Sequence, residues 1–463
     1  MISAPAADEP AMAFPEETAE AASSRDPYLG RKTRQWWLVF VLTFAATLGA
    51  IDRQIMQLLL VPIKQDLGLT DTEISLLYGL AFSLANVLFL LPAGYFADRI
   101  DRRKLLMAGV AVWSLMTAMC GFATNYVAMF LARSGVGFGE SVIQPTGVSM
   151  LRSAIPHERR GRAFAVYAMA IMLGTALALL LGGWLIHLLE GGALSGVPVL
   201  GEVRPWQAVL MILGLLGTPL LVLIVITHEP ARPRSAEQPA SSYRDTLRYL
   251  HANRAVFYPL LIFNTAAGML SLGFGAWVVP MLLRVWGLTI PQVGATLGLM
   301  MLVGPPLGLV VVGWLMDRFS KRYGAAGPLY VGMGAITLIT TVTTLAPIAP
   351  SLAATWALLA GVMLLGGACF PITNTVIASI APPENLGRIT GIQYIIYGIF
   401  AGAISATLIA AVSDKLLGGD ASIAKALSIM CLIYGSISLT AAFVASRALR
   451  RARPFDPAAN SGT

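Results

Sequence analysis

Two long apolar runs are separated by the stretch Gly94-Tyr-Phe-Ala-Asp98-Arg99-Ile-Asp101-Arg102-Arg103-Lys104. A glycine at its start lets two helix ends approach closely, and the carboxylate of Asp98 can accept hydrogen bonds from a neighbouring helix N-terminus. Clustered cations hold a loop on the cytoplasmic side of a membrane. The stretch therefore predicts a tight cytoplasmic loop between two membrane-spanning helices.

The same pattern recurs in the second half of the chain as Gly313-Trp-Leu-Met-Asp317-Arg318-Phe-Ser-Lys321-Arg322, again between two apolar runs. A second motif, Pro-x-Glu-x-x-Gly-Arg, is repeated at nearly the same separation and begins at Pro156 and at Pro382. Two independent motifs repeated at one spacing indicate that the chain consists of two duplicated halves.

The composition indicates a membrane protein, because 56% of the residues are hydrophobic and only 12% are charged. Twelve apolar stretches are long enough to cross about 30 Å of hydrocarbon. They span 36–61, 73–97, 105–123, 126–151, 163–187, 206–227, 256–283, 291–316, 327–347, 352–381, 389–413 and 424–447. We therefore predict an all-α membrane protein with twelve transmembrane helices in two six-helix bundles, related by a pseudo-twofold axis.

Lys and Arg are distributed unequally between the two ends of these helices. They concentrate before the first apolar run, in alternate loops and after the last run, whereas the other loops hold only Lys64, Arg204, Arg284, Lys415 and Lys425. The positive-inside rule then places both termini in the cytoplasm, in a plasma membrane or bacterial inner membrane. The net charge of +8 is explained by this asymmetry and does not indicate nucleic-acid binding.

The predicted domains follow from these runs. They are a disordered cytoplasmic tail (1–30), a first bundle (31–227), a cytoplasmic linker (228–254), a second bundle (255–450) and a cytoplasmic tail (451–463). Within the linker, Tyr243, Leu247 and Leu250 have helical spacing, which predicts a short amphipathic helix on the inner leaflet. A solvated linker is the alternative.

The first apolar run contains Asp52 and Arg53 well inside the expected bilayer. Ionisable groups are costly there and mark functional sites. Arg133, on the fourth predicted helix, reaches about the same depth as Asp52, so we predict an ion pair between these two side chains. The alternative is that Asp52 and Arg53 both extend to the outer membrane edge.

Glu140 lies two helical turns beyond Arg133 on nearly the same helix face, and no other cation is expected at its depth. Burial without a partner favours the protonated form of a carboxylate. We therefore predict Glu140 as the proton-coupling residue, with Asp52 as a second candidate. A polar network that only fixes helix packing is the alternative interpretation.

Asp52-Arg53, the loop that begins at Gly94, and Arg133-x-Gly-x-Gly-x-Gly-Glu140 together resemble the spinster branch of the major facilitator superfamily. The superfamily pattern covers about residues 30–450. The resemblance implies proton-linked transport of lysophospholipids or sphingolipids, with coupling by Asp52 and Glu140 and head-group or ion-pair roles for Arg53 and Arg133. It also implies that the repeated loop motifs control conformational change, through Gly94, Asp98, Arg99, Arg102, Arg103, Gly313, Asp317 and Arg318.

Two departures bear on this resemblance. Leu48-Gly-Ala-Ile precedes Asp52, where animal spinster proteins often carry Asn or Tyr, and the fifth predicted helix has no Gly-Pro of the kind that marks drug antiporters. The first departure puts one head-group contact in doubt, and the second weakens an exporter function.

The second half has no Lys, Arg, Asp or Glu between the ends of its predicted helices. Its candidate cavity residues are instead neutral: Asn264, Asn374, Gln393, Tyr394 and Tyr397. A charged first half that faces an apolar second half fits a ligand with one charged end and one acyl tail.

We therefore predict a proton-coupled secondary transporter of an amphipathic, lysophospholipid-like lipid that works by alternating access. A proton-linked carrier of organic anions or drugs is the alternative. The expected partners are this lipid substrate, protons and membrane lipids, and the protein is expected to be a monomer. No cofactor beyond the proton gradient, no metal and no catalytic residue is expected, because GxSxG, HExxH and phosphate-binding loops are missing from the sequence. A receptor or scaffold without transport is disfavoured by the cost of buried charges.

Overall fold

The computed structural model describes residues 27–28, 30–193, 196–197, 203–231, 243–366, 369–418 and 422–451. These residues are almost entirely helical. Nearly all of the predicted N-terminal tail and all but the first residue of the predicted C-terminal tail lie outside the described residues. The predicted domain boundaries stay a prediction.

The first half forms six helical rods. They are α2 (Lys32–Leu67); α3 (Asp71–Ser75), which continues through the π-helical turn η1 (Leu76–Ala81) into α4 (Phe82–Arg99); α5 (Arg102–Gly121); α6 (Tyr126–Glu140) with α7 (Ile143–Ala154); α8 (His157–Glu190); and α9 (Pro205–Val225).

The second half repeats this arrangement after a short connecting helix, α10 (Tyr243–Ala252). Its rods are α11 (Arg254–Trp286); α12 (Ile290–Tyr323); α13 (Gly327–Leu345), preceded by η2 (Gly324–Ala326) and followed by η3 (Ala346–Ile348); α14 (Leu352–Leu365) with α15 (Cys369–Ile380); α16 (Pro383–Tyr397) with η4 (Gly398–Ile404), α17 (Ser405–Val412) and η5 (Ser413–Leu417); and α18 (Ser422–Arg451).

Ten segments of the described chain are long and apolar enough to cross a membrane. One of them, Ile290–Ile348, contains two rods, α12 and α13. The rod made of α6 and α7 is not among the ten; its two helices meet at Ser141 and Val142. If Ile290–Ile348 is counted as two rods and the rod made of α6 and α7 is added, the described chain contains the twelve predicted rods. This confirms the all-α fold class.

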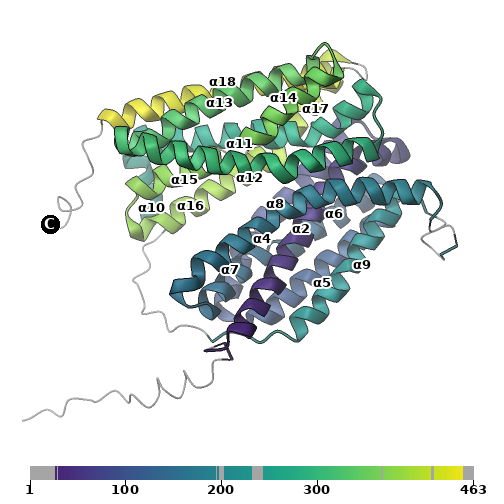
Figure 1. Cartoon of the computed structure of the whole chain (residues 1–463), viewed down its shortest axis with the longest axis horizontal. Coiled ribbons are helices and arrows are strands. Elements are labelled where there is room, and N and C mark those ends of the chain that lie inside the picture. Colours follow the sequence, from purple (N-terminus) through teal and green to yellow (C-terminus); the bar gives the residue numbers. More distant parts are fainter. Residues whose placement is uncertain are drawn as a thin grey trace, which may run out of the picture.

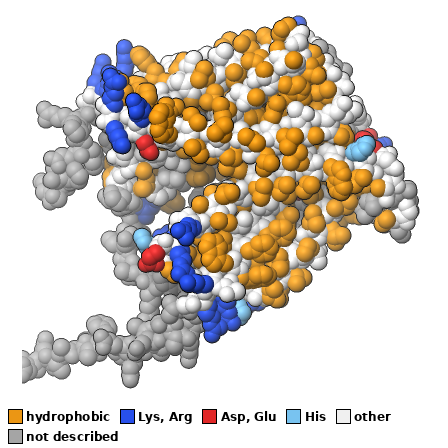
Figure 2. All heavy atoms as spheres, viewed as in Figure 1, with side chains coloured by type: hydrophobic (Ala, Val, Ile, Leu, Met, Phe, Trp, Pro, Cys, Tyr) orange, Lys and Arg blue, Asp and Glu red, His pale blue; other side chains and the backbone are white. Residues whose placement is uncertain are grey.

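The two halves lie side by side as separate bundles, with α8 of the first running along α12 of the second (Figure 1). Hydrophobic side chains cover the middle of the molecule, whereas Lys and Arg gather at one end of the helices (Figure 2). We call this end the basic end. A belt of apolar side chains between two polar ends is the surface that a bilayer requires.

The turn between α2 and α3 shows how local sequence positions the opposite end. Gly68 ends α2 with φ of 64°, a left-handed conformation that glycine adopts without steric cost. Thr70 then caps α3, because its side chain accepts from the Glu73 N–H while the Glu73 carboxylate accepts from the Thr70 N–H. The turn brings Asp71 to the start of α3, where it faces the second bundle.

The predicted amphipathic helix of the linker exists as α10, but it packs on protein. Leu250 is buried against Ile377 and Ile389 of the second bundle, and Thr246 donates to Asn385 at 3.2 Å. Leu247 stays exposed. This part of the linker is therefore attached to the second bundle and is not simply a solvated chain.

Candidate functional site

Asp52 sits in a buried polar cluster at the centre of the first bundle. The Arg133 Nη1 atom donates to its carboxylate at 3.1 Å, and the Thr117 hydroxyl donates at 2.9 Å. The side chains of Asp52 and Arg133 are each 1% exposed. The predicted ion pair is therefore present, and Asp52 does not extend to the membrane edge.

The expectation that Glu140 has no cationic partner is wrong. The Arg53 Nη1 atom lies 2.6 Å from the Glu140 carboxylate, whose side chain is 1% exposed. The prediction compared only the depths of the residues along their helix axes. It did not allow for the length of the Arg53 side chain, which carries its charge far from its own Cα. A Cβ added at Gly49 would lie at van der Waals distance, 3.6 Å, from the Glu140 carboxylate, so α2 and α6 are close at this level.

Asp52 and Arg53 therefore have different surroundings although they are neighbours in sequence. Successive residues on a helix point about 100° apart. Asp52 faces the packed centre of the first bundle, whereas the side chain of Arg53 is 41% exposed and lines a cavity that it shares with residues of the second bundle. Arg53 is thus the accessible charge of the two.

Two small cavities meet at Arg53. One, of about 130 Å³, lies between the bundles and includes Phe82, whose ring lies 5.4 Å from the guanidinium of Arg133 and 6.0 Å from that of Arg53. The other, of about 100 Å³, is lined by Arg53 and Glu140 together with Asn86, Gln144, Tyr167 and Ile171. These last four residues are missing from the predicted site, although a polar side chain within an apolar run was the signal for three of them.

A third cavity, of about 250 Å³, is almost wholly apolar and belongs mainly to the second bundle. It includes Met301 and Pro305 of α12 and Phe274 of α11. Ile171 of α8 lines both this cavity and the one that holds Glu140. A charged cavity and an apolar cavity are therefore neighbours across the boundary between the bundles.

Four of the five neutral residues predicted for the second half divide into two groups. Tyr394 and Tyr397 pack around Phe370, with their ring centroids 5.3 Å and 5.6 Å from that of Phe370.

Asn264 and Gln393 form the other group and are each 1% exposed, so in this conformation they lie inside the second bundle rather than on an open cavity. Asn374 is half-buried.

The repeated loop motifs differ from their predicted structure. A Cβ added at Gly94 or at Gly313 would meet nothing within 4 Å, so neither glycine marks a close approach of helix ends here. Asp101 caps α5, since its carboxylate accepts from the Lys104 N–H at 3.0 Å. The predicted function of the glycines as contact points in this conformation is therefore wrong.

Arg102 of the first loop is 2% exposed, which a loop cation was not expected to be. It donates to the Glu229 carboxylate at 2.7 Å, to Ser153 at 2.8 Å and to the carbonyl of Pro230 at 2.6 Å. These contacts join α5, α7 and the segment that follows α9. We call this group the Arg102 latch.

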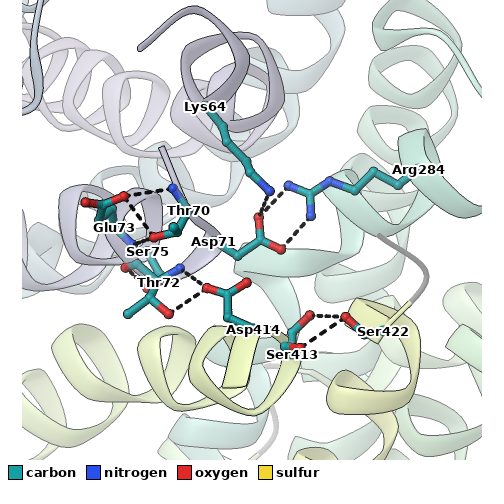
Figure 3. A network of polar contacts seen from close by, with 10 residues as sticks. All are labelled: Lys64, Thr70, Asp71, Thr72, Glu73, Ser75, Arg284, Ser413, Asp414 and Ser422. Atoms are coloured by element: carbon teal, nitrogen blue, oxygen red, sulfur yellow. Dashed lines mark hydrogen bonds and ion pairs between the residues drawn. The ribbon is translucent and has the colours of Figure 1, made fainter. Parts of the chain in front are cut away.

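A network at the end opposite the basic end joins the two bundles (Figure 3). Asp71 accepts two hydrogen bonds from Arg284 of the second bundle, at 2.7 and 2.8 Å, and one from Lys64 at 2.7 Å. Beside it, the N–H and hydroxyl of Thr72 donate to Asp414 at 2.8 and 2.7 Å. We call this network the clamp.

Two bundles of membrane-length helices, with buried ionisable groups and cavities between them, are typical of a membrane transporter. The chain belongs to the Major Facilitator Superfamily, because the sequence model of that family matches residues 42–406.

Several known proteins are similar to this chain. An MFS-type efflux pump of Mycolicibacterium smegmatis is 28% identical, over 62% of this chain and 64% of its own length. A probable L-galactonate transporter of Escherichia coli is 26% identical, over 85% of this chain and 88% of its own. Protein spinster of Drosophila melanogaster is 22% identical, over 85% of this chain and 64% of its own.

Among solved structures, the chain is similar to a bacterial homolog of the human lysosomal transporter spinster in its inward-facing, unoccupied conformation. The TM-score is 0.80 with 21% identity, and the match covers 92% of this chain and 100% of the other. At this identity the similarity shows the shared fold, and the spinster relatives agree with the resemblance seen in the sequence.

Proposed function

We propose that the protein is a proton-coupled secondary transporter of an amphipathic lipid with a small polar head group, such as a lysophospholipid. One observation supports this most: the charged cavity of the first bundle and the apolar cavity of the second meet at Ile171. A lysophospholipid combines an anionic or zwitterionic head group with one acyl chain, and this pair of cavities offers a place for each.

Arg53 is the residue that would meet the head group, because it carries the exposed charge of the site. The charge of Arg133 is already balanced by Asp52 inside the bundle. An anionic head group bound to Arg53 would compete with Glu140 for the guanidinium. A carboxylate that loses its cationic partner in a buried site is stabilised by taking up a proton. The shared cation thus links substrate binding to proton binding at Glu140.

The alternative is a proton-linked carrier of small organic anions or drugs. The similarity to the probable L-galactonate transporter of Escherichia coli supports this alternative. A small carboxylate would also bind Arg53, but it would not fill the apolar cavity beside Met301 and Phe274. The two functions therefore differ in whether an acyl chain contributes to affinity.

The dependence of binding affinity on the length of the acyl chain distinguishes the two functions. A fluorescent lipid analogue bound to the purified protein is displaced by lysophospholipids of increasing acyl length. We expect each added CH₂ that enters the apolar cavity to contribute about 0.8 kcal/mol, until the cavity is full.

The variant Ile171→Trp narrows the junction of the two cavities. We expect it to weaken long-chain ligands while it leaves the binding of a short-chain ligand unchanged. A flat dependence on chain length, with displacement by a small carboxylate, would instead select the organic-anion function.

A further inference from the structure

We propose that the second bundle binds an anionic phospholipid of the surrounding membrane at its basic end, in a site built by α12, α13 and α18. This lipid is not the transported molecule, because the site lies on the outside of the second bundle, away from the cavities at Arg53. The inference therefore goes beyond the proposed transport function and can be tested without it.

The site is organised by a ladder of arginine and tyrosine side chains that crosses three helices. The Arg322 guanidinium lies 5.4 Å from the ring of Tyr323, and this ring packs edge-on against Tyr330 with centroids 5.2 Å apart. The guanidinium of Arg450, on α18, lies 5.0 Å from the centroid of the Tyr330 ring, and its Nε atom donates to the Tyr330 hydroxyl. Stacking on rings fixes a guanidinium while its remaining N–H groups stay available for phosphate oxygens.

The cations around this ladder are exposed. In the ranges that the structure describes, none of them forms an ion pair, and Asp317 is the neighbouring acid in sequence. They are Arg318, Lys321, Arg322, Arg447, Arg450 and Arg451. Figure 2 shows Lys and Arg gathered at this end of the second bundle.

Positive charge at one end of the helices is expected of any membrane protein, but the two repeated loops use it differently. In the first loop, Arg102 is buried in the latch, and Arg103 donates to the carbonyl of Thr227 at 3.1 Å. At the equivalent positions of the second loop, Lys321 and Arg322 are exposed. The first bundle therefore holds these two cations in contacts of its own, whereas the second leaves them exposed.

The partner is a membrane lipid because the same helices continue into an exposed apolar surface. Below the cations, Leu338 of α13 is 56% exposed, and Ile437 and Phe443 of α18 are 47% and 43% exposed. Arg447 lies 4.3 Å from the ring of Phe443, at the border between the charged and apolar parts. A phosphate-bearing head group fits the cations while its acyl chains cover the apolar side chains, as in basic lipid sites between helices.

Native mass spectrometry of the full-length protein tests the proposal. Phosphatidylglycerol and phosphatidylcholine with identical acyl chains are titrated in competition, so that only the head-group charge differs. We expect the wild type to retain phosphatidylglycerol by about tenfold over phosphatidylcholine, and this preference to fall as salt rises. In the triple variant Arg322→Gln, Arg447→Gln, Arg450→Gln we expect the preference to disappear.

The matched control removes three exposed cations from the same end of the first bundle: Lys104→Gln, Arg152→Gln and Arg162→Gln. It should retain the wild-type preference. A separate variant, Tyr330→Leu, keeps every charge but removes the ring at the centre of the ladder, and it should lose several-fold of the preference. Unchanged preference in the first triple, or equal losses in both triples, would overturn the proposal. If the first triple does not fold, a wild-type preference in Tyr330→Leu would overturn it.

Discussion

Arg53 is shared between a buried carboxylate and an open cavity, and this sharing is the basis of the first prediction. Glu140→Gln should retain ligand binding and tighten it for an anionic head group, because the variant removes the carboxylate that competes for Arg53. The pH dependence of transport should flatten, since the amide cannot exchange a proton. Uptake into proteoliposomes, measured from mildly acidic to mildly alkaline pH, checks this. An unchanged pH profile in Glu140→Gln would rule out the proton assignment.

A second variant, Arg53→Gln, distinguishes the role of Arg53 from that of Glu140. Arg53→Gln removes the proposed head-group contact as well as the partner of Glu140, so binding of the anionic ligand should weaken by about tenfold or more. If Glu140→Gln and Arg53→Gln weakened binding equally, the accessible charge of the site would have been misassigned.

The second prediction concerns the buried pair of Asp52 and Arg133. Asp52→Asn leaves Arg133 as a buried cation without a counter-charge, a defect that costs about 3–5 kcal/mol. It should therefore lower expression and the thermal unfolding midpoint. Arg133→Ala should be less harmful when Asp52→Asn is also present, because the double variant removes both charges. A double-mutant cycle on the unfolding free energy measures this coupling, and strictly additive losses would refute it.

At the scale of single elements, the two copies of the loop predict unequal losses of stability for the same change from a cation to Gln. Arg102→Gln removes a buried cation that holds Glu229, Ser153 and Pro230, and we expect it to lower the unfolding free energy by about 3 kcal/mol. Lys321→Gln at the equivalent exposed position should change it by less than about 0.5 kcal/mol. Thermal unfolding of both purified variants makes the comparison, and equal destabilisation would show that the latch is unimportant.

At the scale of the whole molecule, the clamp joins the bundles at the end opposite the basic end, and its contacts must break if that end opens. The hydrogen bonds between Thr72 and Asp414 place these residues close enough for a cross-link. The double variant Thr72→Cys, Asp414→Cys should form a disulfide under oxidation that abolishes transport, and a reductant should restore it. Each single cysteine variant serves as the control. Full transport by the oxidised, cross-linked protein would show that this end does not open.

A second contact between the bundles is made by backbone rather than side chains. A Cβ added at Gly79 of η1 would lie 3.1 Å from the carbonyl oxygens of Gly402 and Ala403 in η4. π-Helical turns such as these two often occur at functional sites. Gly79→Ala should therefore weaken the contact and alter the transport rate more than ligand affinity. Transport kinetics and equilibrium binding on one preparation distinguish the two effects.

The features that the sequence predicted are those that depend on local properties. Span length, loop charge and the two repeated motifs are local, so the twelve rods followed from them. The ion pair of Asp52 and Arg133 could be predicted from the depth of the two residues in the membrane, because both lie near the middle of their helices. The contact between Arg53 and Glu140 did not, because it depends on the reach of one side chain.

The clamp and the latch could not be predicted for a different reason. Asp71 and Arg284 lie in different halves of the chain, and only the packing of the two bundles brings them together. Likewise, nothing near Arg102 in sequence reveals that Glu229 returns to it after α9. Such long-range pairs depend on tertiary structure and leave no periodic signal.

The divergence between Arg102 and Lys321 has a consequence for comparing the two halves by alignment. A gene that contains one ancestral unit twice carries each motif in duplicate, and each copy is free to acquire its own task. An alignment of the two halves would predict that Lys321 is buried, as Arg102 is, but the side chain of Lys321 is exposed. Tolerance to substitution at one copy is therefore no guide to tolerance at the other, and each should be judged from its own surroundings.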